Sequence, residues 1–206
     1  MKLFPIRKYF LTTFKPLITQ KADELDVLND ALKHSMAPIH IDVVSNSGGK
    51  ISEYERLVCN LEWALANGKR VHIDFRGICI SCGAVFFMKS LELSKLYQSC
   101  TISYNELTYL VFHQPTIDLS NMGKLVANND SKNAFCQLNE KFEHLDKVAS
   151  KYFEKYFHEC LDLFVEDCLV DVLKEEYASL AYDGTVKDIP IAINDSVRSE
   201  YFKLPT

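Results

Sequence analysis

The feature that most constrains the fold of this chain is a repeated order of elements: a strand-like segment, a glycine turn and a helical segment. Ile39–Val44 alternates and then runs apolar, as a strand does, and it leads into the glycine-rich turn Ser45–Gly49. A helical pattern follows from Ser52 to Asn67. Strands that are connected through helices in this order pair in parallel by right-handed crossovers. The order predicts an α/β domain.

The same order recurs directly downstream. Val71–Phe75 is a second alternating strand, and the run after Gly77 through Leu96 has the composition of a helix. Ser52 has Glu55 three residues later, which is the spacing of a capping box, so we expect Ser52 to cap the first of the two helices. Further elements are expected at 21–34 (helix), 100–104 and 109–113 (strands), 131–157 (the longest helix), 160–182 (helical stretches) and 186–193 (short closing strands).

Length and composition favour one globular domain over residues 1–206. The chain is 48% apolar and 25% charged, and its sequence contains no apolar run near the roughly 18 residues of a membrane span. A net charge of −5 gives nucleic acid no basic surface to bind. Seven dispersed cysteines, an odd number, favour a reducing compartment, and the first 13 residues lack the pattern of a secretory signal. We therefore expect a cytoplasmic protein without nucleic-acid or membrane partners.

A single serine, Ser81, lies within the small-residue run Gly77–Ala84, where a strand ends and a helix begins. A serine hydroxyl becomes a nucleophile when a base removes its proton. The best base in the sequence is His113, which ends the apolar strand that precedes Gln114 and Pro115. Each residue has a plainer interpretation, because serine is a common helix cap and a lone histidine is more often structural.

The turn Ser47–Gly48–Gly49 is a third candidate element. Backbone N–H groups that follow a strand can bind a developing oxyanion, and glycine permits the close approach that this requires. An ordinary turn before a helix would have the same sequence. Cys79 and Cys82 form a CxxC, yet no second ligand pair completes a metal site, so two buried cysteines at a helix start are the simpler interpretation.

Taken together, the segments Ser45–Gly49, Gly77–Ala84 and Val111–Pro115 resemble, in this order, the three motifs of the ClpP-like serine peptidases, the proteolytic subunit of the Clp protease. The resemblance spans roughly residues 9 to 193. It implies the ClpP/crotonase-like fold of stacked ββα repeats, with a first strand near Lys8–Thr12 and a long handle helix at 131–157. Departures from the family pattern include Ser47 in place of proline and Ile80 and Cys82 around the serine.

The resemblance also implies roles for residues. Ser81 would be the nucleophile and His113 the base, with Asp171 completing the triad and Asp167 as second choice for that place. The backbone N–H groups of Gly48 or Gly49 and of Cys82 would form the oxyanion hole. A plainer interpretation for either aspartate is an exposed position on a helix.

The implied activity is that of a serine endopeptidase that needs neither cofactor nor metal and acts on peptides or unfolded proteins. A homo-oligomeric ring is implied too, and an ATPase unfoldase is a possible partner, although room for the family's N-terminal axial loops is lacking before the first strand. Two alternatives stay open: a catalytically inactive ClpP-like scaffold or regulatory subunit of a ring, and acyl-CoA chemistry as in crotonases. The Ser81 and His113 pair argues against the crotonase alternative.

Overall fold

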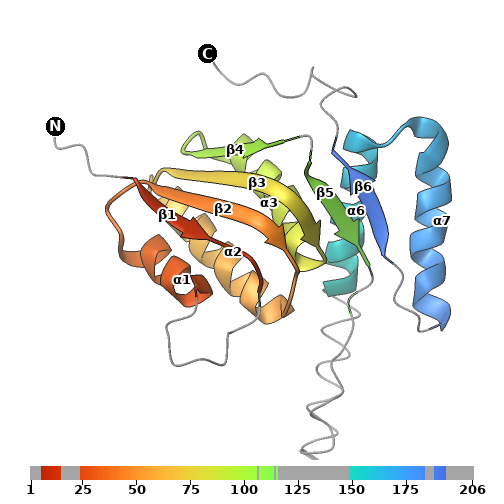
Figure 1. The fold of residues 1–206 in the computed structure, drawn as a ribbon, viewed down its shortest axis with the longest axis horizontal. Coiled ribbons are helices and arrows are strands. Elements are labelled where there is room, and N and C mark those ends of the chain that lie inside the picture. Colours follow the sequence, from red (N-terminus) through yellow and green to blue (C-terminus); the bar gives the residue numbers. More distant parts are fainter. Residues whose placement is uncertain are drawn as a thin grey trace, which may run out of the picture.

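The computed structural model describes residues 6–14, 24–105, 107–113, 115, 149–183 and 188–193, apart from the side chains of 168 and 178–183. Its elements follow in the order β1 (Arg7–Phe10), α1 (Glu24–His34), β2 (Ile39–Asn46), α2 (Ile51–Ala66), β3 (Val71–Ile80), α3 (Cys82–Leu96), β4 (Cys100–Tyr104), β5 (Tyr109–Phe112), α6 (Lys151–Phe164), α7 (Asp167–Asp183) and β6 (Ile189–Ala192). Figure 1 shows the strands side by side in one twisted sheet.

The sheet has six strands in the order β1-β2-β3-β5-β6, with β4 attached to β3 as well. All pairs are parallel except β5 with β6. The first half of β3 pairs with β4 from Val71 to Phe75, and its last residues pair with β5 from Ile78 to Ile80. β3 therefore bends from one neighbour to the next, and its end is delivered beside β5.

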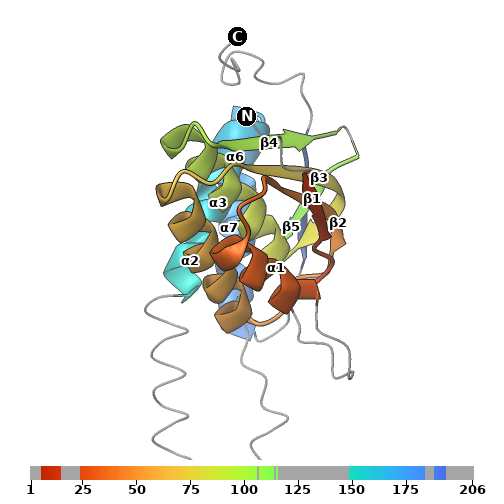
Figure 2. The same ribbon diagram turned by 90° about the vertical axis from the view of Figure 1, so that its left-hand side faces the viewer.

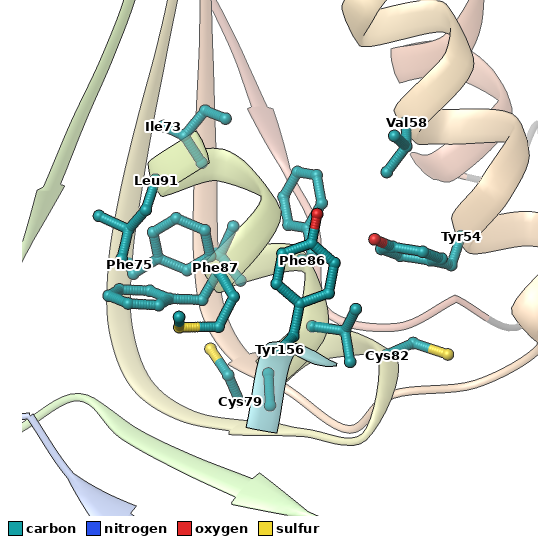
Figure 3. Close-up of a cluster of buried hydrophobic side chains, with 14 of the residues drawn as sticks. Tyr54, Val58, Ile73, Phe75, Cys79, Cys82, Phe86, Phe87, Leu91 and Tyr156 are labelled. Carbon is teal, nitrogen blue, oxygen red and sulfur yellow. The ribbon is translucent and has the colours of Figure 1, made fainter. Parts of the chain in front are cut away.

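The helices cover one face of the sheet, as the rotated view of Figure 2 shows. Alternate residues of β2 and β3 point into this layer and are buried, among them Ile41, Val43, Ile73 and Phe75. Aromatic rings fill the space between the layers, with centroids 4.9 Å apart for Phe75 and Phe87 (Figure 3). Burial of apolar surface on this scale is the main force that holds α2, α3 and α6 on the sheet.

The prediction of an α/β domain with parallel strands joined through helices is confirmed in the described residues. The strand at 100–104 has the predicted bounds, and 109–113 is one residue shorter. None of the described helices combines the length and apolar composition needed to cross a membrane.

The capping-box prediction for Ser52 and Glu55 is wrong. α2 begins at Ile51, its N-cap position is Lys50, and no side chain caps it. The Lys50 N–H donates to the Phe14 carbonyl at 3.1 Å, while the Lys50 carbonyl accepts bonds from the first helical turn. This contact with the segment after β1 fixes where the helix starts, and a local sequence pattern does not contain it.

Two other boundaries differ from the sequence prediction. Residues 78–80, expected to open a helix, continue β3, because Gly77 at φ +90° lets the strand bend and pair with β5. The helix expected to end at Phe157 continues as α6 to Phe164. Residues 131–148 of that predicted handle helix lie outside the described residues.

Candidate active site

Ser81 stands at the turn between β3 and α3, with φ 56° and ψ −118°. Non-glycine residues rarely adopt this conformation, which costs about 1–3 kcal/mol. Ser81 holds the N-cap position of α3, but its side chain makes no capping hydrogen bond. The cap interpretation therefore does not account for the hydroxyl. A strained strand-to-helix turn is the geometry that exposes a nucleophilic serine in hydrolases with a nucleophile elbow.

The glycine turn after β2 packs directly against Ser81. A Cβ added to Gly48, which has φ +74°, would lie 2.9 Å from Ser81 Cβ and 2.7 Å from the Ile80 carbonyl oxygen. Both distances are shorter than any side chain tolerates, so only glycine fits at position 48 in this conformation. The structure thus brings together two of the three segments that the sequence singled out.

The third segment lies on the other side of Ser81. The Ser81 N–H donates to the Val111 carbonyl at 2.8 Å, extending the pairing of Ile80 with Val111 between β3 and β5. His113 follows Val111 by two residues and is half-buried at the carboxyl end of β5. The strand register therefore delivers His113 to the same end of the sheet as Ser81.

Backbone hydrogen bonds decide which way the Gly48–Gly49 peptide faces. Gly49 forms a bridge with Phe14 in which the Phe14 N–H donates to the Gly48 carbonyl at 2.8 Å and the Lys50 N–H to the Phe14 carbonyl. In a parallel bridge of this kind the N–H and carbonyl of the bridged residue point to the opposite side. Consistently, the Cys82 thiol donates to the Gly49 carbonyl at 3.5 Å. The Gly49 N–H therefore faces the start of α3.

The two glycines of the turn have different roles in this geometry. The Gly48 N–H donates to Asn46 Oδ1 at 2.8 Å and is occupied. The Cys82 N–H belongs to the first turn of α3, where backbone donors have no partner within the helix. Of the predicted oxyanion donors Gly48, Gly49 and Cys82, the last two have N–H groups suited to an anion beside Ser81.

The neighbouring thiols are neutral. Burial raises the pKa of the Cys82 thiol to about 12, although its hydrogen bonds with the Ser81 side chain and with the backbone of Gly49 and Cys82 act in the opposite direction. Burial also raises the pKa of the Cys79 thiol to about 12. Because the thiolate is the reactive and metal-binding form, the geometry favours Ser81 over Cys82 as nucleophile.

Asp171, the predicted third member of the triad, is exposed on the second turn of α7 and has no hydrogen bond or ion pair with a described residue. Asp167 is exposed on the first turn of the same helix. His113 lies where β5 ends. Because Phe112 pairs with Ile189, the first residue of β6, the antiparallel strand β6 begins at this same end of the sheet. In Figure 1 the helix α7 has its last turn, and not its first, near this end of β5 and β6. Asp171 stays a prediction.

Asn46 is a site residue to which the sequence reasoning gave no role. It is fully buried, accepts from the Gly48 N–H, and donates through Nδ2 to the Leu11 carbonyl at 3.4 Å. Its amide also lies against Gly83, where an added Cβ would meet Asn46 Oδ1 at 2.8 Å. An asparagine two residues before a glycine is a signal for an Asx turn, and this signal could have indicated the bond between the Gly48 N–H and Asn46 Oδ1.

A second group of titratable residues lies on the open face of the sheet. His40, Asp42 and Asp74 have ligand-type atoms within 4.8 Å of one another. Both carboxylates are paired with Arg76, which contacts Asp42 Oδ1 at 2.6 Å and Asp74 Oδ2 at 3.0 Å. Lys8 adds a third charge contact at 2.5 Å from Asp42. These side chains neutralise one another without a metal.

The site thus consists of Ser81 on a strained turn, the glycine turn packed against it, and β5 leading to His113. No family model and no curated protein matches the chain.

Proposed function

We propose that this protein is a serine endopeptidase of the ClpP-like type. The observation that carries the proposal is the meeting of three sequence motifs at one residue: Gly48 packs on Ser81, and the Ser81 N–H bonds to the strand that ends at His113. The positive φ of Ser81 and its missing cap bond support a hydroxyl kept for chemistry. The six-stranded sheet with its helices on one face belongs to the general α/β class, and the ClpP-like fold is part of the proposal.

In the proposed reaction Ser81 Oγ attacks a peptide carbonyl while His113 takes the hydroxyl proton. The N–H groups of Gly49 and Cys82 bind the negative charge that develops on the carbonyl oxygen. The tetrahedral intermediate then collapses, His113 gives its proton to the leaving amine, and an acyl-enzyme remains on Ser81. Water activated by His113 hydrolyses this ester and restores the serine. An aspartate, for which Asp171 is the prediction, would orient the imidazole.

The proposed substrate class is an extended peptide or unfolded protein, and the proposed assembly is a homo-oligomeric ring. An ATPase unfoldase as partner is part of the same resemblance. A cytoplasmic location agrees with the five cysteines that the structure describes as free, namely Cys59, Cys79, Cys82, Cys100 and Cys160.

The second candidate function is a catalytically inactive ClpP-like subunit that serves as scaffold or regulator in a ring. One observation favours it: residues 167–183 form a continuous helix, and Asp171 is exposed on its second turn without a described partner. Without an aspartate to stabilise the charged imidazole, a Ser81 and His113 pair would lose much of its rate.

A fluorophosphonate probe distinguishes the two candidates. In the peptidase, Ser81 Oγ bonds to phosphorus, fluoride leaves and the hydroxyl proton passes to His113. We expect labelling of the folded, assembled protein that is lost in Ser81→Ala and retained in Ser47→Ala, since Ser47 is an exposed serine of the adjoining turn. Absence of labelling in a folded and assembled wild-type protein would reject the peptidase in favour of the inactive subunit.

A further inference from the structure

Asn46 contacts three parts of the site that are distant in the sequence. Its Oδ1 accepts from Gly48 N–H at 2.8 Å within the glycine turn, and its Nδ2 donates to the Leu11 carbonyl after β1. The same amide packs against Gly83 in the first turn of α3. A buried polar side chain with contacts on three segments fixes their spacing, because each lost contact leaves a buried group unsatisfied.

The spacing that Asn46 sets is the one between the two candidate oxyanion donors. Gly49 belongs to the turn, whereas Cys82 adjoins Gly83 at the start of α3. Consecutive glycines can rotate the peptide between them at little steric cost, so the turn needs an external constraint to keep Gly49 N–H toward α3. The bond from the Gly48 N–H to Asn46 Oδ1 holds the backbone just before this peptide. The bond from the Phe14 N–H to the Gly48 carbonyl holds the peptide itself.

We propose that Asn46 is a positioning residue for acyl transfer: its buried amide fixes the glycine turn against the first turn of α3 and so holds the N–H groups of Gly49 and Cys82 beside Ser81. This inference rests on the proposed function. It places Gly48 N–H outside the anion site, and it makes an asparagine side chain, which touches no substrate, a determinant of the rate of the covalent step.

The kinetics of fluorophosphonate labelling test this role, because they separate probe binding (KI) from the covalent step (kinact). For Asn46→Ala we expect kinact to fall by about tenfold or more, with KI changed less than about threefold, since misplaced oxyanion donors act on the transition state. The control is Asn60→Ala. Asn60 is another buried asparagine, whose Nδ2 on α2 donates to Asn29 Oδ1 on α1 at 2.6 Å. This bond involves no residue of the candidate site, so its loss should leave kinact unchanged.

A second variant guards against a fold defect. Asn46→Ser introduces a hydroxyl that can accept from the Gly48 N–H in place of the amide oxygen, and it should recover part of the kinact lost in Asn46→Ala. The inference is overturned if Asn46→Ala lowers kinact no more than Asn60→Ala, if the loss lies in KI, or if the serine variant recovers nothing. These outcomes test the role of Asn46 only when the wild-type protein is labelled by the probe. An unlabelled wild type instead rejects the proposed function.

Discussion

A serine backbone at φ 56° and ψ −118° is held there by its surroundings, because the residue itself prefers other conformations. Glycine has no such preference, so Ser81→Gly should relieve the strain and raise the free energy of unfolding by about 1 kcal/mol, after the entropy cost of glycine is subtracted. Ser81→Ala retains the strain and should leave stability nearly unchanged. Urea denaturation of the two variants measures the difference. Equal stabilities would show that the turn is unstrained.

Gly48 and Gly68 form a matched pair for testing the close approach to Ser81. Both have φ +74°, but an added Cβ meets Ile80 and Ser81 at position 48 and nothing within 4 Å at position 68. Gly68→Ala should therefore cost only the backbone term of about 1–2 kcal/mol. Gly48→Ala should cost at least about 1 kcal/mol more and abolish fluorophosphonate labelling. Similar losses of stability in the two variants would contradict the packing described here.

At the scale of elements, Asp42 links β1, β2 and β3 on the open face of the sheet. Burial by itself would raise the pKa of Asp42, but hydrogen bonds from Lys8 and Arg76 outweigh it and hold the pKa below its ordinary value of 3.8. As the pH falls, Asp42 is therefore protonated in the unfolded chain before it is protonated in the folded protein. The stabilisation from this carboxylate is complete above about pH 4 and is lost as the pH falls through the lowered pKa of the folded state.

Asp42→Asn should accordingly lower the free energy of unfolding by about 2 kcal/mol at pH 7 and flatten its decline at acid pH. Unfolding titrations between pH 7 and pH 2 measure both effects. Asp30→Asn is the control, because Asp30 and His34 are highly exposed and 3.8 Å apart on α1. An acid dependence that stays unchanged in Asp42→Asn would mean that other carboxylates dominate it.

The sequence predicts an element of this fold correctly where apolar and polar side chains alternate along the strand. Val71–Phe75 and Cys100–Tyr104 were predictable because their apolar residues face the helices at every second position. The extension of β3 to Ile80 was not, since it depends on Gly77 bending and on β5 arriving to pair. The start of α2 likewise depends on Phe14, which is remote in the sequence.

The same division applies to the candidate site. Residue types and order indicated Ser81, His113 and the glycine turn. The conformation of Ser81 and the contacts of the Asn46 amide with Leu11 and Gly83 arise between segments, so no local pattern contains them. The bond from the Gly48 N–H to Asn46 Oδ1 is local, and an Asx-turn pattern could have indicated it. Asp171 was placed by its distance from Gly184 along the chain, and the uninterrupted helix α7 makes that distance a poor guide to space.

At the scale of the whole molecule, the cysteines report on packing. Cys59 is exposed, whereas Cys79, Cys82, Cys100 and Cys160 are buried. Burial also raises the pKa of these four thiols above the ordinary value of 9. Iodoacetamide at pH 8 should therefore modify Cys59 quickly and the other four only on global unfolding, as peptide mapping by mass spectrometry can measure. Fast modification of Cys82 in the native protein would contradict the packing at the start of α3.

The position of β5 between β3 and β6 has a consequence for the order in which the molecule becomes complete. Its pairing with β3 joins residues about 30 positions apart, whereas its pairing with β6 joins Tyr109 to Ala192 across most of the remaining chain. Contacts this distant in the sequence form slowly. During synthesis, the strand that leads to His113 therefore keeps an open edge until β6 has left the ribosome, so a nascent chain should complete the candidate active site only after nearly all of its core has folded.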